Sequence, residues 1–303
     1  MEDDNSIFLL AALYSFIVLF GFITNSLIIT ATFSSKSLHS SCNILIAFCS
    51  FSDIIHMFGH LPKIIWIFSG HFYMSSYLCN ALQVIPIFGL TAGTFGILSI
   101  GVDRLISVLF PTFYTTKSAF KYLMSHALVI IAYFSSQCAL ILSNFEDKQV
   151  ICSLPEVFHG MAKENWAMFS CLIYIISFIV YLIVWVQVRR KGGPNLRVFR
   201  SIFTVMIVVV LGWFTGMAGF LVVRLATSLE GKDLYIAEEL LGLPVNLSLC
   251  ANYFVYYYLR EMFSGDYRTV FHRQLRRIPI IGGRFSTVHG VINVSHSRSE
   301  TAR

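Results

Sequence analysis

The feature that most limits how this chain can fold is the spacing of its charged residues. Seven intervals of about twenty residues or more contain no Asp, Glu, Lys or Arg, apart from Asp53 in the second interval. A helix needs about 20 consecutive apolar residues to cross the hydrocarbon core of a bilayer. The spacing therefore predicts an all-α membrane protein, a seven-helix bundle with spans at about residues 7–33, 42–68, 76–109, 122–143, 166–188, 199–225 and 234–259.

Composition supports the membrane class. Of the 303 residues, 56% are hydrophobic and 13% are charged, whereas soluble domains carry about 25% charged residues. The chain shows no internal repeat, no low-complexity block and no long soluble insertion, so we expect residues 1–303 to form one domain. The first apolar run is too long for a cleaved secretory signal, so it should remain as a helix.

The distribution of charge between the spans predicts the orientation, because cytoplasmic loops of membrane proteins are enriched in Lys and Arg. With the N-terminus outside, the inner side holds Lys36, Arg104, Lys117, Lys121, Arg189, Arg190, Lys191, Arg197, Arg200 and the arginines after Tyr258. The outer side then holds Lys63, Lys148, Lys163, Arg224 and Lys232 with most of the acids, including Glu146, Asp147, Glu238 and Glu239. The net charge of +6 is concentrated where an anionic leaflet attracts it, so nucleic-acid binding is not indicated.

The segment after the seventh span, residues 260–303, is expected to be a cytoplasmic tail. Its first part carries apolar residues at helical spacing between basic ones, namely Phe263, Tyr267, Val270, Phe271 and Leu275. This pattern favours a short amphipathic helix on the inner membrane face. A solvated tail without such a helix is the alternative.

Asp53 is an acid in the middle of the second span. Ionisable groups inside a membrane are costly, and each one is a functional hypothesis by default. Its candidate partners are Asn25 in the first span and Ser248 and Asn252 in the seventh. We interpret this polar core as a water- or sodium-filled cluster that rearranges during a switch, with a static set of interhelical hydrogen bonds as the alternative.

His56 and His60 follow Asp53 at i+3 and i+7 and share its helix face. Two histidines on one face suit a metal site, but no cysteine or acid cluster nearby completes a ligand set. We therefore expect them to line a pocket in the outer half of the bundle, and we expect no metal and no other cofactor.

Two cysteines fall on the oxidising outer side of the membrane. Cys79 precedes the third span and Cys152 lies in the second outer loop, so we expect a disulfide that pins this loop over the mouth of the bundle. The others lie in or next to spans as small apolar packing residues, namely Cys42, Cys49, Cys138, Cys171 and Cys250.

Seven spans with the N-terminus outside, and several motifs at characteristic distances, resemble a rhodopsin-like G-protein-coupled receptor. In that family a cysteine at the top of the third helix precedes the arginine of an Asp-Arg-Tyr motif by twenty-five residues, and Cys79 stands at that distance from Arg104. Asp103-Arg104-Leu105 resembles the motif itself, with Leu105 in place of the tyrosine. The strings LHSSCNILIAFCSFSDI, GWF and ANYFVYYYLREMF are similar, more narrowly, to the nematode serpentine chemoreceptors of the Srsx class.

The resemblance assigns roles to further residues. It makes Asn25 and Asp53 the polar residues of the first and second helices, and Asn252 to Tyr256 resembles Asn-Pro-x-x-Tyr with the proline replaced. The implied activation switch consists of Asp103, Arg104, Tyr181, Trp213, Asn252 and Tyr256. The chain lacks the usual prolines in the fifth span and after Trp213, so kinks there would have to come from Gly212, Gly216 and Gly219.

The resemblance also implies a latch at the inner end of the third helix. Paired with Asp103 and shielded, Arg104 would hold the resting arrangement. Once released, it would swing toward Tyr181 or Tyr256 while the sixth helix moves outward and opens a cleft for the G protein. The alternative is an interfacial ion pair that anchors a helix end.

The ligand pocket implied by the resemblance excludes two ligand classes. Amine receptors carry an Asp where this chain has Pro86, and opsins carry a Lys where it has Asn246. The pocket positions are mostly apolar with a few hydrogen-bonding groups: Gln83, Pro86, Ile87, Leu90, Thr91, Asn165, Met217, Phe220, Gly242 and Asn246. Such a lining suits a small, weakly polar molecule. A peptide that touches the outer acids Glu230, Asp233, Glu238 and Glu239 is the alternative, and solvated loop charges explain those acids equally well.

The expected function is therefore that of a chemosensory G-protein-coupled receptor in the plasma membrane, for which a sensory cilium is one suitable site. Its expected partners are a heterotrimeric G protein, an odorant-like small molecule or a peptide, and membrane lipids. A neuropeptide receptor is the alternative. A transporter or channel is less favoured, because Asp53 is the one clear charge within a span and no inverted repeat is visible. No catalytic set stands at working spacing, so an enzyme is not indicated.

Overall fold

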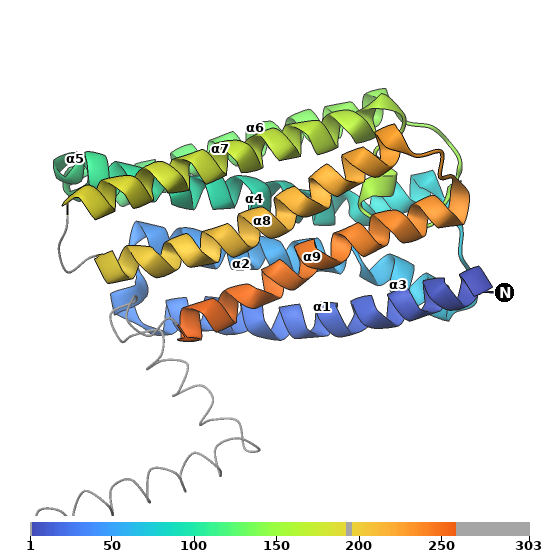
Figure 1. The fold of residues 1–303 in the computed structure, drawn as a ribbon, viewed down its shortest axis with the longest axis horizontal. Coiled ribbons are helices and arrows are strands. Elements are labelled where there is room, and N and C mark those ends of the chain that lie inside the picture. The colour runs from blue at the N-terminus through green and yellow to red at the C-terminus, as the bar shows by residue number, and fades with distance from the viewer. Residues whose placement is uncertain (1, 192–195, 259–303) are drawn as a thin grey trace, which may run out of the picture.

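The computed structural model describes residues 2–191 and 196–258, and within them the chain is almost entirely helical. The long helices lie side by side along one axis, with the N-terminus at one end of the bundle (Figure 1). They are α1 (Glu2–Ser34), α2 (Ser41–Phe58) with its short continuation α3 (Leu61–Phe68), α4 (Ser76–Leu109), α6 (Ala119–Ser143), α7 (Met161–Lys191), α8 (Leu196–Ala226) and α9 (Gly231–Tyr258). The connections contain a short α5 (Pro111–Thr116) and the 3₁₀ turns η1 (Lys36–Leu38) and η2 (Pro155–Val157).

Length and hydropathy make these helices membrane spans. Within the described residues, six are long and apolar enough to cross a bilayer, with α2 and α3 counted together, and α8 adds the apolar stretch Val210–Ala226. The predicted all-helical membrane bundle is therefore confirmed. The amphipathic helix and tail predicted for residues 260–303 lie outside the described residues.

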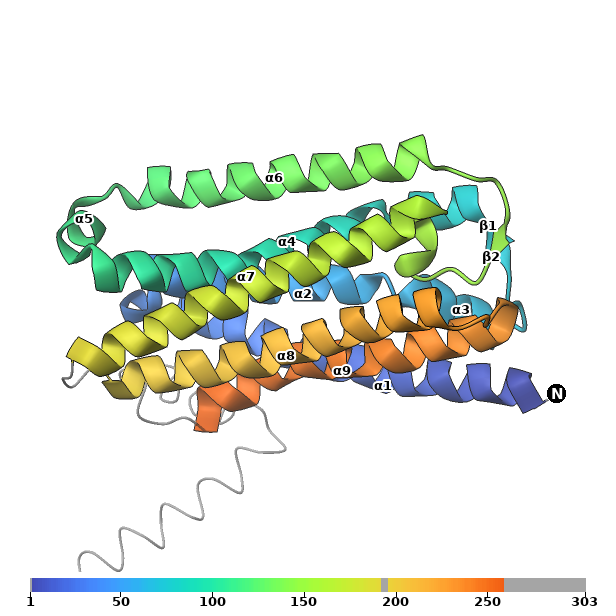
Figure 2. The same cartoon turned by 45° about the horizontal axis from the view of Figure 1, so that its top comes forward.

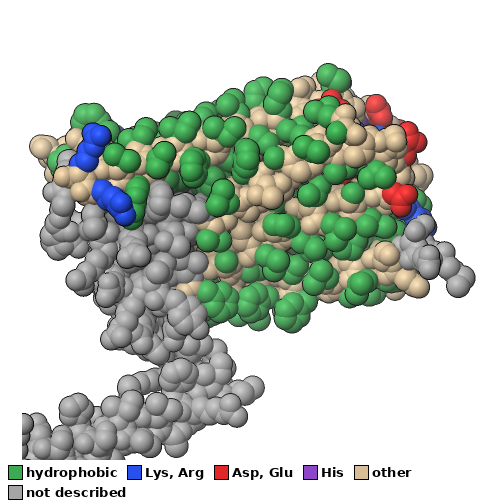
Figure 3. Space-filling view, viewed as in Figure 1, with side chains coloured by type: hydrophobic (Ala, Val, Ile, Leu, Met, Phe, Trp, Pro, Cys, Tyr) green, Lys and Arg blue, Asp and Glu red, His purple; other side chains and the backbone are tan. Residues whose placement is uncertain are grey.

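Apolar side chains cover the long face of the bundle, and charged side chains gather at its ends (Figure 3). α4 is central, since 72% of its apolar window is buried inside the protein, whereas α6 has 17% buried and lies at the edge (Figure 2). The exposed apolar side chains along these helices match the hydrocarbon of a bilayer. Polar interactions are thus concentrated in the interior and at the two ends.

A short break separates α2 from α3. Gly59 caps the C-terminal end of α2, and Pro62 lies in the first turn of α3. Backbone N–H groups in a first turn make no hydrogen bond within the helix, so a proline there costs none. After the break, His60 and Lys63 both lie buried at the outer end of the bundle. The sequence assigned Lys63 to the outer side as an ordinary flanking charge, but its side chain is enclosed by helices.

The outer connections form a small covalently fixed cap. Strand β1 (Met74–Ser75) pairs antiparallel with β2 (Gln149–Val150), so that Met74 lies opposite Val150. The predicted disulfide between Cys79 and Cys152 is present, with 5.4 Å between the two Cα atoms. Together these contacts hold the second outer loop against the top of α4.

Small residues allow α8 and α9 to pack closely. A Cβ atom at Gly212 would meet Ser248 Cβ at 2.9 Å, and one at Gly219 would meet the side chain of Leu241 at 2.6 Å. A Cβ at Gly216 would collide with Val245. These three glycines, which the sequence offered as sources of a kink, therefore bring two backbones together beside Trp213.

Candidate functional site

A cavity opens in the outer half of the bundle, with about 450 Å³ of space, part of it open to solvent. Four of the predicted pocket residues line it, namely Leu90, Met217, Gly242 and Asn246. The other lining residues are Tyr14, His56, His60, Ser153, Leu154, Pro155, Trp166, Trp213, Glu238, Glu239 and Val245. The pocket that the sequence predicted for His56 and His60 is therefore present, and Trp213 forms part of its wall.

Six predicted pocket residues are absent from this lining: Gln83, Pro86, Ile87, Thr91, Asn165 and Phe220. The residues of α4 are excluded because α4 packs closely against α2. A Cβ atom at Gly59 would lie only 2.9 Å from Pro86 Cβ. Gln83 uses the same contact to donate a hydrogen bond to the Gly59 carbonyl at 2.8 Å. The cavity accordingly lies nearer to α1, α2 and α9 than the sequence predicted.

Aromatic rings connect this cavity across the bundle. The ring centroids lie 4.8 Å apart between Tyr14 and His60, 5.5 Å between His60 and His56, and 5.7 Å between His56 and Trp213. Trp213 then stacks on Tyr174 at 5.5 Å. A displacement at either histidine therefore bears directly on Trp213, because packed rings leave little free volume.

Asn246 fixes the orientation of His60. The amide nitrogen of Asn246 donates to the Gly242 carbonyl at 2.9 Å, which turns its oxygen toward His60. Nε2 of His60 lies 2.9 Å from that oxygen. Because an amide oxygen only accepts, Nε2 of His60 carries the proton and donates.

A buried ion pair closes the cavity on the side of α1. Lys63 pairs with Glu239, and their side chains are 1% and 7% exposed. Tyr14 donates to the Glu239 carbonyl at 2.8 Å, and the ammonium of Lys63 lies 3.8 Å from the Tyr14 ring centroid. The interpretation of Glu239 as a solvated loop charge is therefore wrong, because its carboxylate is buried and paired with Lys63.

A second network lies between this cavity and an outer vestibule. Lys163 donates to Glu156 at 2.5 Å and to Glu238 at 3.0 Å, and Arg224 reaches Glu238 at 3.4 Å. Glu238 is 7% exposed, so it too is a buried pair member and not the solvated acid expected from sequence. Of the other two acids in that hypothesis, Glu230 and Asp233 are exposed.

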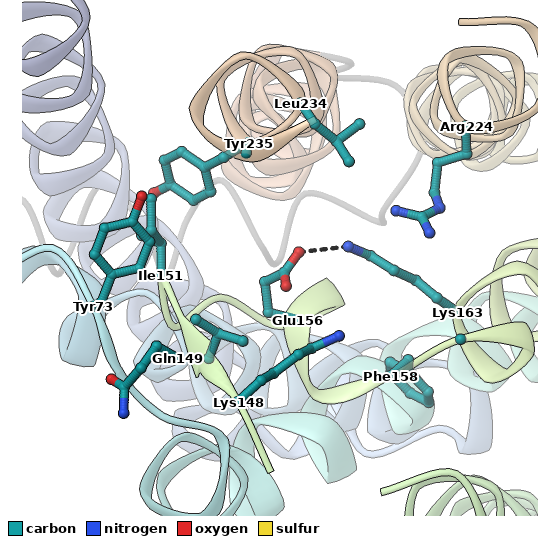
Figure 4. A pocket seen from close by; sticks show the side chains of 13 residues that line it. Tyr73, Lys148, Gln149, Ile151, Glu156, Phe158, Lys163, Arg224, Leu234 and Tyr235 are labelled. Atoms are coloured by element: carbon teal, nitrogen blue, oxygen red, sulfur yellow. Dashed lines mark hydrogen bonds and ion pairs between the residues drawn. The ribbon is translucent and has the colours of Figure 1, made fainter. Parts of the chain in front are cut away.

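The vestibule itself holds about 740 Å³ of space, part of it open to solvent. Its walls come from Tyr73 just before β1, from the second outer loop with β2, and from the outer ends of α7, α8 and α9 (Figure 4). Glu156, Lys163 and Arg224 line it, whereas Glu238 lines the inner cavity. The ion-pair network therefore separates the two spaces.

At the inner end, the carboxylate of Asp103 is fully buried and accepts hydrogen bonds from several side chains. Arg104 pairs with it, and Tyr114 on α5 donates to it at 3.1 Å. Lys117 approaches Asp103 at 3.4 Å, and Arg104 also donates to the Tyr114 hydroxyl at 2.8 Å. Burial lowers the pKa of Lys117, an effect that Asp103 opposes.

The sequence did not single out Tyr114 for this role. It follows Pro111 at the start of a short helix, eleven residues after Asp103, so only the folding back of α5 brings it to the pair. Tyr181, expected to face the arginine, instead donates to the Ile97 carbonyl at 2.5 Å. The side chain of Tyr256 lies outside the residues whose side chains are described.

The polar core around Asp53 differs from the expected cluster. Asn25 donates to the Gly21 carbonyl at 3.0 Å, and Ser248 donates to the Val245 carbonyl at 2.6 Å. The oxygen of Asn252 is buried without a partner among the described residues. Asn25 also donates to the Leu249 carbonyl of α9 at 3.5 Å, so it links α1 to α9. No hydrogen bond joins these side chains to Asp53 in the part of the chain described.

Comparison with known proteins agrees with this architecture. Residues 18–275 match the family model described as serpentine type 7TM GPCR chemoreceptor Srsx. The chain is also 23% identical over 292 residues to C-C chemokine receptor type 1 of Macaca fascicularis, covering 88% of this chain and 80% of that protein. The chain therefore belongs to the Srsx family of serpentine G-protein-coupled chemoreceptors, which are multi-pass plasma-membrane receptors and not enzymes.

Proposed function

We propose that this chain is a chemosensory receptor that binds a small, weakly polar extracellular ligand in the inner cavity and then activates a heterotrimeric G protein. The observation that carries the proposal is that one residue of the predicted activation switch, Trp213, also lines the cavity. Trp213 lines the cavity and also belongs to the ring chain that reaches Tyr174. A ligand in contact with this wall acts on a residue near the centre of α8.

The ring chain supplies the route from ligand to helix movement. Tyr174 is fully buried and shares a hydrogen bond of 2.9 Å with Thr94 on α4. Trp213 thus touches α2 through His56 and α7 through Tyr174. The helices around Trp213 can pack in a resting and an active arrangement. A ligand that binds one of them more tightly shifts the equilibrium toward it, by an amount set by the difference in affinity.

The inner end supplies the response. Asp103 holds Arg104 in place with help from Tyr114 and Lys117. Outward movement of the inner end of α8 would then open the inner face to the G protein. In this proposal the Asp103 cluster stabilises the resting state, and Arg104 forms new contacts in the active one.

The test uses Arg104→Ala in cells with calcium and cAMP reporters. We expect signalling to be lost while an epitope tag at the N-terminus still reports normal surface expression. His71→Phe, at an exposed outer position, is the control and should leave signalling unchanged. Intact signalling by Arg104→Ala would refute the assigned switch.

A peptide ligand is the second candidate. It is favoured by the vestibule of about 740 Å³ at the outer mouth, which is larger than the inner cavity. It is also favoured by the likeness to a protein named as a chemokine receptor. Screening neuropeptides and odorants on the same cells separates the two, since a peptide should depend on Glu156 and Arg224 and an odorant on His56.

A further inference from the structure

Three side chains that line the inner cavity carry four buried polar atoms with no hydrogen-bond partner among the described residues. These atoms are both ring nitrogens of His56, Nδ1 of His60 and Nε1 of Trp213. The three side chains are 5%, 6% and 3% exposed. Asn246 lies close to His56, but its amide oxygen accepts from His60 and its amide nitrogen donates to Gly242, so it does not meet His56 in hydrogen-bond geometry. A buried polar group without a partner is costly, so this wall is built for a polar occupant.

The chemistry of each atom defines what the occupant must offer. The indole N–H of Trp213 can only donate. His60 donates through Nε2 to Asn246, so in the neutral ring Nδ1 is an acceptor. A neutral His56 presents one donor and one acceptor in either tautomer. The wall therefore offers two donors and two acceptors within one continuous row of rings.

Charge around the cavity is already neutralised. The described residues that line it include no Lys or Arg. Its two carboxylates are engaged, Glu239 by Lys63 and Glu238 by Lys163 and Arg224. A cationic ligand would find no free carboxylate, and an anionic ligand no free cation, among the lining residues. Either would enter an apolar environment without compensation, which is unfavourable for a charge.

We propose that the inner cavity recognises an uncharged head group that both donates and accepts hydrogen bonds, a hydroxyl or a primary amide, carried on a small apolar body. The proposal rests on the proposed function, which places the ligand in this cavity. A carboxylate satisfies the donors but repels the lone pair of His60, and an ammonium satisfies the acceptors but opposes the N–H of Trp213. Leu90, Met217 and Val245 supply apolar contacts for the body.

The test measures binding directly, with purified full-length receptor and five probes that share one hexyl chain: hexan-1-ol, hexanamide, hexyl methyl ether, hexanoate and hexylamine. Binding is read as the rise in melting temperature with probe concentration, because a ligand that binds only the folded state stabilises it. We expect hexan-1-ol and hexanamide to stabilise the receptor. The ether, which only accepts, should bind about tenfold more weakly, and the two charged probes should have no effect.

Three variants locate the effect. His56→Phe keeps a ring of similar size and removes both nitrogens, so the preference for alcohol over ether should disappear. His56→Gln restores a donor and an acceptor and should recover part of it. His71→Phe, at an exposed position outside the cavity, should match the parent. His60→Phe is avoided, because it would also strip Asn246 of its partner.

The outcomes separate this inference from the proposed function. If hexanoate or hexylamine stabilises the receptor as much as hexan-1-ol, or if no neutral probe stabilises it, the inference is wrong. It is also wrong if the parent and His56→Phe discriminate alcohol from ether equally. If the neutral probes bind as expected but nucleotide exchange on a G protein never responds to any ligand, the inference stands and the proposed signalling function fails.

Discussion

Lys63 and Glu239, separated by 176 positions in the chain, form an ion pair that is almost completely buried at the outer end of the bundle. The pair joins the α2–α3 unit to α9, and Tyr14 attaches α1 to the same point through the Glu239 carbonyl. The first, second and seventh spans are therefore joined at the Lys63–Glu239 ion pair. Tyr14 and Glu239 of this junction line the inner cavity, so under the proposed function a loss of the ion pair should also weaken ligand binding.

Removing one member of this pair should be more damaging than removing both. Lys63→Met or Glu239→Gln leaves an unbalanced group in a site of low dielectric, and each should lower the free energy of unfolding by about 3–5 kcal/mol. The double variant Lys63→Met/Glu239→Leu should recover most of that loss. Melting temperatures of the purified receptors check this, and simple additivity of the two single effects would contradict it.

Tyr114→Phe should raise basal signalling. The change removes a hydroxyl that bonds both Asp103 and Arg104, while the ring that faces Lys117 stays in place. Loss of about 0.5–1.5 kcal/mol per bond would increase the active population several-fold. The readout is ligand-free nucleotide exchange on a G protein. Tyr77→Phe, at an exposed outer position, should change nothing.

Replacing both cysteines of the disulfide by serine should destabilise the outer cap. The bond closes a loop across 73 positions, and its loss should cost about 2–4 kcal/mol. Because the same loop supplies Ser153, Leu154 and Pro155 to the cavity, ligand binding should weaken as well. Cys138→Ser, a free cysteine, serves as control. A double serine variant with unchanged melting temperature would argue against a stabilising cap.

Gly216→Ala should separate α8 from α9. The added methyl would collide with Val245 and approach the Leu241 carbonyl at 3.0 Å, so overpacking should cost about 1–3 kcal/mol. Thr215→Ala alters the exposed neighbour and should be nearly neutral. Thermal unfolding compares the two variants. Equal stability would show that the close helix contact is not needed.

The outer loop should loosen in mild acid. Nδ1 of His159 accepts a hydrogen bond from the Glu146 backbone at 2.8 Å, and burial lowers the pKa of this histidine. As the pH falls below about 6.5, His159 is protonated more readily in the unfolded loop than in the folded loop. The contribution of His159 to the stability of the folded loop, which is present at neutral pH, is therefore lost. The rate at which a phosphine reduces the disulfide should rise between neutral pH and about pH 5.5. His159→Asn keeps an acceptor and should remove this pH dependence.

The amino-acid sequence by itself determined the properties that belong to continuous stretches of chain. Apolar length fixed the helical membrane class, and the distances between Cys79, Arg104 and the motifs around Asp53 pointed to the receptor family. Placement on the oxidising side was enough to predict the disulfide partner of Cys79. Each of these follows from composition or spacing along one chain.

Tertiary structure alone decided which distant side chains meet. Successive residues of a helix point about 100° apart, so a small rotation of one span decides whether Glu239 faces solvent, Lys63 or the cavity. The same holds for Tyr114, which reaches Asp103 only because α5 folds back, and for Gln83, which the α2–α4 contact removes from the cavity. The pairing of buried charges and the row of unpartnered rings are properties of helix rotation and packing, which hydropathy along the chain does not encode.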